Sequence, residues 1–296
     1  MMNLAEYRNS ATRLADFLPW AALVASGIVL NKDGSFQRTA RFRGPDLDSA
    51  VPAELVGVAG RLNNVLRRLG SGWALFVEAQ RLPASVYPAG RFPDAASALV
   101  DAERKAAFEE QGAHYESAYY LTFLYLPPAW ASAGAERFLY EGRSRAAGAD
   151  GREILAGFTD RTERVLQLLD GFMPECHWLD DGETLTYLHS CISTRRQRVR
   201  VPEVPMYLDG LLADRPLTGG LEPKLGDCHL RVLTIVGFPG TTTPGLLDEL
   251  NRLAFAYRWS TRAILLDKTD ATRLLTRIRR QWFAKRKSIA AILKEV

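Results

Sequence analysis

Residues 22–44, ALVASGIVLNKDGSFQRTARFRG, predict that an antiparallel hairpin lies near the start of the chain. Apolar and polar residues alternate loosely on either side of residues 31–34, as expected for strands with one buried face. Asp33 and Gly34 tolerate the positive φ angles that a tight turn requires. We therefore expect two strands joined at this turn, with residues 22–30 forming the first.

Outside this hairpin, helical and strand patterns alternate without strict βαβ repetition. Apolar residues at helical spacing between Leu55 and Leu69 predict a first helix, capped by Asp48 or Ser49 and ended by Gly70. We expect further helices over residues 92–112, 152–171, 182–194 and 243–257, and strands over residues 73–82, 119–128, 174–181, 229–238 and 258–267.

This mixture predicts an α+β fold with largely antiparallel sheets and packed helices, ending in a long basic helix. Pro174 is the best candidate boundary. We expect two mixed subdomains, one over residues 1–173 and one over residues 174–296, and we expect the second to be truncated within its last helix.

Composition excludes several classes of protein. The chain has 296 residues, of which 47% are hydrophobic and 24% charged, which is ordinary for a globular protein. The longest apolar stretch, residues 20–30, is roughly half of the ~20 residues that a membrane-spanning helix needs. The first twenty residues contain acidic side chains and lack the apolar core of a signal peptide. We expect a cytoplasmic protein.

Catalytic and metal-binding motifs are missing from the sequence. A phosphate-binding loop needs GxxxxGK[ST], and neither LTGGLEPKLGD nor GFPGTTTPG fits it. No GxSxG motif is present, and no histidine has a clear base partner in sequence. Cys176, Cys191 and Cys228 each lie near a histidine, but adjacent Cys-His pairs are poorly spaced for zinc, so buried thiols are favoured. We expect no catalytic, cofactor-binding or metal-binding residue in this chain.

The last 27 residues carry the positive charge. This segment contains eight Lys or Arg residues and only two acidic residues, Asp270 and Glu295. The net charge of the whole chain is +4. An apolar stripe containing Leu274, Ile278 and Trp282 runs beside a basic face. Three interpretations stay open. The pattern favours packing of the apolar stripe on the body of the protein. In the second interpretation, the basic face binds anionic lipid or nucleic acid. In the third, the helix leads into another domain.

Four segments carry a resemblance to a known family. They are LADFLPWAALVASGIVLNKDGSFQRTARFRGPDLDS, STRRQRVRVPEVPMYLDGLL, LTGGLEPKLGDCHLRVLTIVGFPG and YRWSTRAILLDKTDATRLLTRIRRQWFAKRKS. With them the chain resembles the amino-terminal part of the conjugal-transfer (TrbE) members of the CagE/TrbE/VirB family of type IV secretion ATPases. The resemblance runs from the first residues to the last, and residues after about Pro174 look like the start of the family's namesake domain.

The resemblance implies a scaffold and docking region of a longer ATPase. Full-length members carry a RecA-like domain with Walker motifs, so ATP and Mg are expected only in a part that would follow Val296. The family also implies docking at the cytoplasmic face of the bacterial inner membrane, self-association and contact with a small TrbD/VirB-type membrane protein. We expect that membrane partner to contact the first hairpin and the segment around Trp20.

For the contact itself we predict six residues of the terminal helix, with Trp282 as the aromatic anchor. They are Arg279, Arg280, Trp282, Lys285, Arg286 and Lys287. The alternative is a membrane- or nucleic-acid-binding module that acts through this helix, with no ATPase activity in the chain alone.

Overall fold

The computed structural model describes residues 13–46, 49–84, 86–110, 114–128, 151–237, 240–241, 246–247, 250 and 252–292, with the backbone but not the side chains of residues 285–292. Its helices are α1 (Leu14–Phe17), α2 (Pro52–Leu66), α3 (Ala95–Glu110), α5 (Gly151–Asp170), α6 (Asp181–Ile192), α7 (Leu208–Leu212) and α8 (Lys268–Ile292). Its strands are β1 (Trp20–Ala25), β2 (Ile28–Asn31), β3 (Phe36–Arg43), β4 (Trp73–Pro83), β5 (Tyr115–Tyr125), β6 (Glu175–Trp178), β7 (Leu217–Thr218), β8 (Lys224–Leu225), β9 (Cys228–His229) and β10 (Tyr257–Ile264). The predicted α+β class, antiparallel pairing and terminal helix are confirmed.

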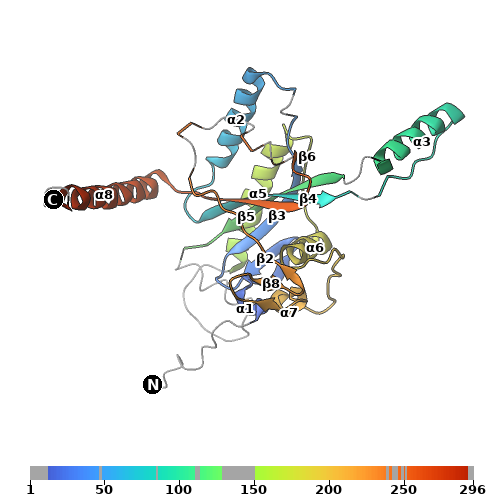
Figure 1. The fold of residues 1–296 in the computed structure, drawn as a ribbon. Coiled ribbons are helices and arrows are strands. Elements are labelled where there is room, and N and C mark those ends of the chain that lie inside the picture. The colour runs from blue at the N-terminus through green and yellow to red at the C-terminus, as the bar shows by residue number, and fades with distance from the viewer. Residues whose placement is uncertain are drawn as a thin grey trace.

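A seven-stranded sheet forms the centre of the molecule (Figure 1). Its strand order is β1-β2-β3-β5-β4-β10, and β6 pairs with the second half of β3 beyond the point where β2 stops. Every pair is antiparallel. A small second sheet contains β7, β8 and β9. The large sheet takes β6 and β10 from residues after Pro174, so both predicted segments contribute to it; the division into two subdomains itself stays a prediction.

Each face of the large sheet has its own apolar core, because successive residues of a strand point to opposite faces. In β2, Ile28 and Leu30 belong to one core, whereas Val29 belongs to the other. Helices α2 and α5 cover the first face, where Phe158 of α5 stacks on Phe36 at 5.8 Å and on Trp73 at 5.6 Å between ring centroids. Helices α6 and α7 cover the second face.

The hairpin after Asn31 is confirmed, and a second turn precedes it. Gly34 has a φ of +83°, and the side chain of Asp33 accepts a hydrogen bond from the Ser35 amide at 2.9 Å. Residues 22–30, however, do not form a single strand. The chain turns at Gly27 (φ +64°), so that β1 and β2 pair with each other. The single-strand prediction is wrong because residues on both sides of Gly27 are apolar enough to conceal the turn.

Two other local predictions are wrong. The N-cap of α2 is Val51, whose amide donates to Glu54 Oε2 at 3.1 Å, and Pro52 begins the helix. Residues 230–237 form no strand although they are apolar, and the side chains of Leu233 and Val236 are 94% and 100% exposed. A strand needs a hydrogen-bonding neighbour. The Leu230 amide still donates to the Pro223 carbonyl at 2.8 Å, next to the pairing of β8 with β9, but no described strand pairs with residues 231–237.

The helix predicted over residues 243–257 is also wrong for the described residues: residues 253–256 form no helix, and Tyr257 begins β10. Residues 243–245, 248–249 and 251 lie outside the described part of the chain.

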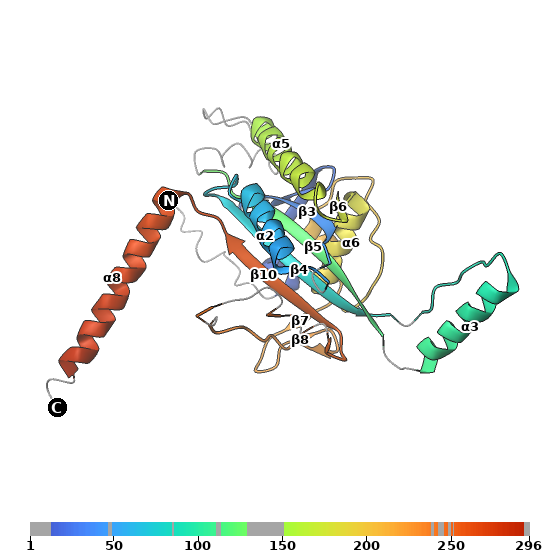
Figure 2. The same cartoon turned by 90° about the horizontal axis from the view of Figure 1, so that it is seen from above.

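Helices α3 and α8 both extend away from the sheet, on opposite sides of the molecule (Figures 1 and 2). Helix α3 is carried on a long insertion between β4 and β5 and has no buried residue. None of the described helices is long and apolar enough to cross a membrane.

Candidate docking site on the terminal helix

The start of α8 is fixed to the body of the protein by a short turn. Strand β10 ends beside β4, where the Leu265 amide donates to the Trp73 carbonyl at 2.9 Å. Ser71 then accepts from the Asp267 amide at 3.0 Å and donates to Asp270 Oδ2 at 2.5 Å. Asp270 also places negative charge in the first helical turn, where the helix dipole favours it. These contacts set the direction in which α8 leaves the sheet.

Beyond this first turn the helix stands clear of the body (Figure 2). The side chains of Leu275, Ile278 and Trp282 are 66%, 50% and 59% exposed. The favoured prediction, that the apolar stripe packs on the rest of this chain, is therefore wrong for the described residues. Periodicity reveals an apolar face but carries no information about what covers it.

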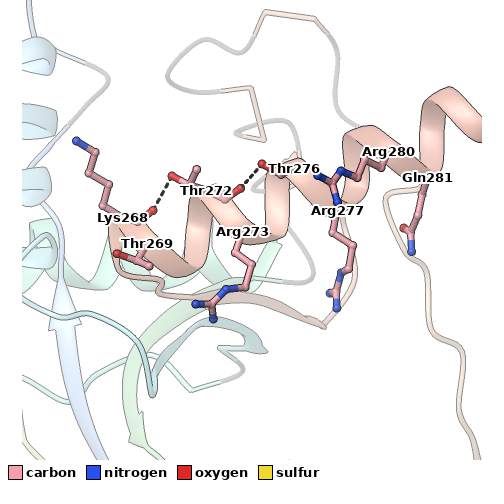
Figure 3. Close-up of a pocket in the computed structure, with 8 residues that line it drawn as sticks. All are labelled: Lys268, Thr269, Thr272, Arg273, Thr276, Arg277, Arg280 and Gln281. Atoms are coloured by element: carbon pink, nitrogen blue, oxygen red, sulfur yellow. Dashed lines mark hydrogen bonds between the residues drawn. The ribbon is translucent and has the colours of Figure 1, made fainter.

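The helix is amphipathic in the sense that the sequence predicts. At about 100° per residue, Leu274, Ile278 and Trp282 fall within one stripe, while Arg273, Arg277 and Arg280 fall on another face. Figure 3 shows this polar face, with Arg273 and Arg277 extending from the same side of the helix. Thr272 and Thr276 lie between the cations, and each hydroxyl donates to the carbonyl four residues earlier at 2.8 Å. The guanidinium groups are thus the polar groups that this face offers to a partner.

The structure does not bring the six predicted contact residues onto a single face. Arg280 belongs to the basic face, whereas Arg279 lies at the border of the apolar stripe, with its guanidinium carbon 5.5 Å from the centroid of the Phe283 ring. Trp282 meets the edge of the same Phe283 ring at 5.8 Å. Lys285, Arg286 and Lys287 continue the helix, and their side chains lie outside the described part of the chain.

The first hairpin is a poor candidate for a partner surface. Trp20 is 7% exposed, and Val29 and Leu30 are fully buried. These residues fill the two cores of this chain, so the expectation that the hairpin and the segment around Trp20 face a membrane partner is not supported by the geometry.

The cysteines lie on three different elements: Cys176 on β6, Cys191 on α6 and Cys228 on β9. Burial raises the pKa of the Cys176 thiol to about 11. Burial also raises the pKa of Cys191 to about 11, against the opposing effect of Arg258, whose Nη2 donates to its sulfur at 3.1 Å. Across the described ranges, no group of three His, Cys, Asp or Glu side chains is placed to hold a metal ion.

A second cationic site was not predicted. Arginines of β3, β4, β10 and the segment after α6 line one cavity on the second face of the sheet. The run RRQRVR at residues 195–200 could have indicated this site in the sequence. Nothing in the sequence, however, shows that Arg41, Arg81 and Arg258 lie near it.

Comparisons with known proteins agree on one family. The model for the N-terminal domain of the type IV secretion system ATPase VirB4/TrbE matches residues 27–133. The conjugal transfer protein TrbE of Rhizobium radiobacter is 33% identical in an alignment of 298 positions that covers 95% of this chain. A probable conjugal transfer protein of Sinorhizobium fredii (strain NBRC 101917 / NGR234), named as the first portion of a TrbE, is 38% identical over 146 residues, and the match covers 98% of that protein and 48% of this chain. The chain belongs to the VirB4/TrbE family of type IV secretion ATPases.

The match to the family is to an amino-terminal region. This chain spans 36% of the length of the Rhizobium radiobacter TrbE. The protein of the same Sinorhizobium strain that is named as the second portion of TrbE is 39% identical over 100 residues, which is 34% of this chain and 15% of that protein.

Proposed function

We propose that this chain is the scaffold and docking region of a conjugal-transfer ATPase, coupling the motor to the inner-membrane side of the secretion channel and supporting self-association. The observation that carries the proposal is the exposure of α8. Burying a Leu, Ile or Trp side chain contributes about 1.5–3 kcal/mol. A helix whose Leu275, Ile278 and Trp282 side chains are at least half exposed is therefore suited to gain part of this stabilisation from a partner.

Trp282 is the proposed anchor of this contact, because tryptophan and arginine dominate the energetics of protein interfaces. Arg279 lies beside the same aromatic pair, at the border of the stripe, and adds charge next to an apolar contact. The proposed partner is a small TrbD/VirB-type inner-membrane protein. The corresponding location is the cytoplasmic face of the bacterial inner membrane.

A flotation experiment tests the docking proposal. The purified chain is mixed with inverted inner-membrane vesicles from cells with or without the conjugal-transfer genes. We expect binding to depend on those genes and the double variant Ile278→Ala/Trp282→Ala to weaken it at least tenfold, about 1.4 kcal/mol. Leu99→Ala is the matched control, because Leu99 is 62% exposed on α3 at the other side of the molecule. Equal binding to both kinds of vesicle would rule the proposal out.

ATP and Mg are proposed to bind outside these 296 residues, in the Walker-motif domain that the longer members of the family carry. The purified chain is then expected to show no ATP turnover above background, whereas the complete ATPase turns ATP over. Turnover that disappears on mutation of a residue in this chain would contradict the assignment.

The alternative is a membrane- or nucleic-acid-binding module that works through the basic face of α8. The favouring observation is that residues 271–292 contain no acidic side chain. Clustered Lys/Arg near an anionic membrane gain about 1 kcal/mol each, and phosphate contacts make binding salt-dependent. This alternative predicts salt-sensitive binding to phosphatidylglycerol vesicles or DNA that weakens in the variant Arg279→Glu/Arg280→Glu/Lys287→Glu. Binding that does not change with salt removes it.

A further inference from the structure

A cavity of about 630 Å³ lies on the second face of the sheet, between β4, β10, α6 and the segment that follows α6. Its volume is within the range of about 300–1,000 Å³ that is usual for ligand sites. It is remote from the exposed part of α8, and the docking proposal does not use it.

Six of the residues that line this cavity are arginines: Arg41, Arg81, Arg195, Arg196, Arg198 and Arg258. The single carboxylate among the lining residues is Glu183, whose Oε2 already accepts from the Asp180 amide at 3.0 Å in the cap of α6. A partly enclosed site with one sign of charge focuses its field on ligands of the opposite sign. The cavity is therefore built for an anion.

The arginines divide into two groups. Arg258 donates to the carboxylate of Glu78, with Nε at 2.8 Å from Oε1, and Arg41 lies 3.6 Å from Glu175. The Nε atom of Arg81 donates to the Leu253 carbonyl at 3.1 Å. The other three, Arg195, Arg196 and Arg198, have no side-chain partner in the part of the chain that the structure describes. These three are available to a ligand.

The segment that carries Arg196 and Arg198 is held against the body of the protein. Residues 195–202 run without helix, turn or bend. Val199 fixes this segment, because its amide donates to Thr186 Oγ1 at 3.0 Å and its side chain packs against the second core. Arg196 and Arg198 are both exposed, whereas Val199 beside them is partly buried. Two arginines thus lie two residues apart on a segment that is fixed to the body.

We propose that this cavity binds an extended acidic peptide of a partner protein, with Asp or Glu at alternate positions. In an extended peptide such carboxylates repeat at intervals of about 6.5 Å, which allows neighbouring ones to reach different arginines of the cavity. A guanidinium matches a carboxylate through two parallel hydrogen bonds. Leu82 and Tyr120 supply an apolar wall for the side chains between the carboxylates.

One further feature suits a peptide ligand. Strand β10, which contributes Tyr257 and Arg258, lies at the edge of the sheet, where an added strand finds unpaired backbone groups. His189 also lines the cavity and is 2% exposed. Its Nε2 lies 3.1 Å from Asp214 Oδ2, so the ring is paired with that carboxylate at the wall of the cavity.

Fluorescence anisotropy with a labelled peptide of alternating Val and Glu, eight residues long, tests the proposal. We expect the 296-residue chain to bind it and the double variant Arg196→Glu/Arg198→Glu to raise the Kd at least tenfold. The matched control is Arg61→Glu/Arg68→Glu on and just after α2, which reverses two charges on the opposite face of the sheet and is expected to change the Kd less than twofold. All four sites are exposed, so circular dichroism is expected to be unchanged in both variants.

The peptide series separates the outcomes. A peptide of the same composition with its four Glu in one block is expected to bind at least fivefold more weakly, and a Val-Gln peptide not at all. Equal affinity for the alternating and block peptides, or equal loss in the two double variants, overturns the proposal. The proposal is also overturned if the chain binds tripolyphosphate or oligo-dT but does not bind the alternating peptide. Ile278→Ala/Trp282→Ala is expected to leave the Kd unchanged, which separates this site from docking by α8.

Discussion

Gly27 adopts a backbone conformation that other residues rarely take, and its surroundings leave no room for a side chain. Its φ is +64°, and a Cβ at this position would lie 2.3 Å from the Leu179 carbonyl oxygen. Its amide donates to Asp181 Oδ1 at 2.6 Å. The turn between β1 and β2 is thereby held against the start of α6, so one glycine joins two elements far apart in sequence.

Gly27→Ala is expected to lower the free energy of unfolding by about 1–3 kcal/mol, since it combines a strained φ with a steric clash. Urea unfolding followed by circular dichroism measures the change. Gly57→Ala in α2 is the control: a Cβ there meets nothing within 4 Å, so the change is expected to be neutral or to stabilise by about 0.5–1 kcal/mol. Equal effects of the two substitutions would contradict this account of Gly27.

Asp214 gives the stability of the protein a dependence on pH. Burial raises the pKa of its carboxyl, but interactions with His189 and Ser193 outweigh burial, so the pKa lies below its usual value. A folded-state pKa below the unfolded one means that the carboxylate stabilises the fold above about pH 4. This stabilisation is lost as the pH falls through the folded-state pKa.

Asp214→Asn is therefore expected to lower the thermal midpoint at pH 7 and to have a smaller effect at pH 3. At low pH the wild-type carboxyl is increasingly protonated, and it then resembles the neutral amide. Thermal melts of both proteins at the two pH values provide the test. A difference in midpoint that stays constant, or grows towards low pH, would show that the ionised carboxylate does not stabilise the fold.

At the scale of elements, α8 and α5 show how the same amphipathic pattern leads to opposite outcomes. Helix α5 buries Phe158, Val165 and Leu169 against the sheet, with Phe158 only 1% exposed. Helix α8 has an apolar stripe as well, but the side chains of Leu275, Ile278 and Trp282 are 66%, 50% and 59% exposed. The stability of this chain therefore depends on α5 and hardly at all on the outer part of α8.

Leu275→Ala and Trp282→Ala are accordingly expected to change the free energy of unfolding by no more than about 0.5 kcal/mol, as is usual for surface sites. Phe158→Ala is expected to cost about 3–5 kcal/mol, because it leaves a cavity between Phe36 and Trp73. Urea unfolding of the three variants makes the comparison. A loss of about 2 kcal/mol or more for Trp282→Ala would show that α8 packs on the body after all.

At the scale of the whole molecule, the sheet depends on residues from both predicted segments. Strand β6 pairs with β3, β10 pairs with β4, and α6 and α7 cover the second face. A fragment of residues 1–173 lacks all four of these elements. It would leave Trp20 and Val29 exposed, although both are buried in the complete chain.

We expect this 1–173 fragment to bind a hydrophobic dye and to unfold without a sharp transition. Co-expression with residues 174–296 is expected to restore cooperative unfolding. Calorimetry of the two fragments, separately and together, makes the test. A single cooperative transition in 1–173 alone would instead support the predicted division into two independent subdomains.

Elements with a long, regular pattern were predicted well from the sequence. The expected helices over residues 152–171 and 182–194 correspond to α5 and α6, and the strands over 73–82 and 119–128 correspond to β4 and β5. The prediction failed where a partner distant in sequence decides the outcome. Residues 231–237 have the composition of a strand but no described strand to pair with, and residues 22–30 are broken by a turn that contacts Leu179 and Asp181.

The amino-acid sequence was sufficient for the α+β class, the antiparallel hairpin, the amphipathic basic helix and the family, because each depends on local periodicity, turn chemistry or direct similarity. The three-dimensional fold was needed to show that α8 leaves its apolar stripe in water. It was also needed to gather Arg41, Arg81 and Arg258 around Arg196 and Arg198. Both results concern residues that are distant along the chain. Local sequence patterns do not indicate which of these distant residues come into contact.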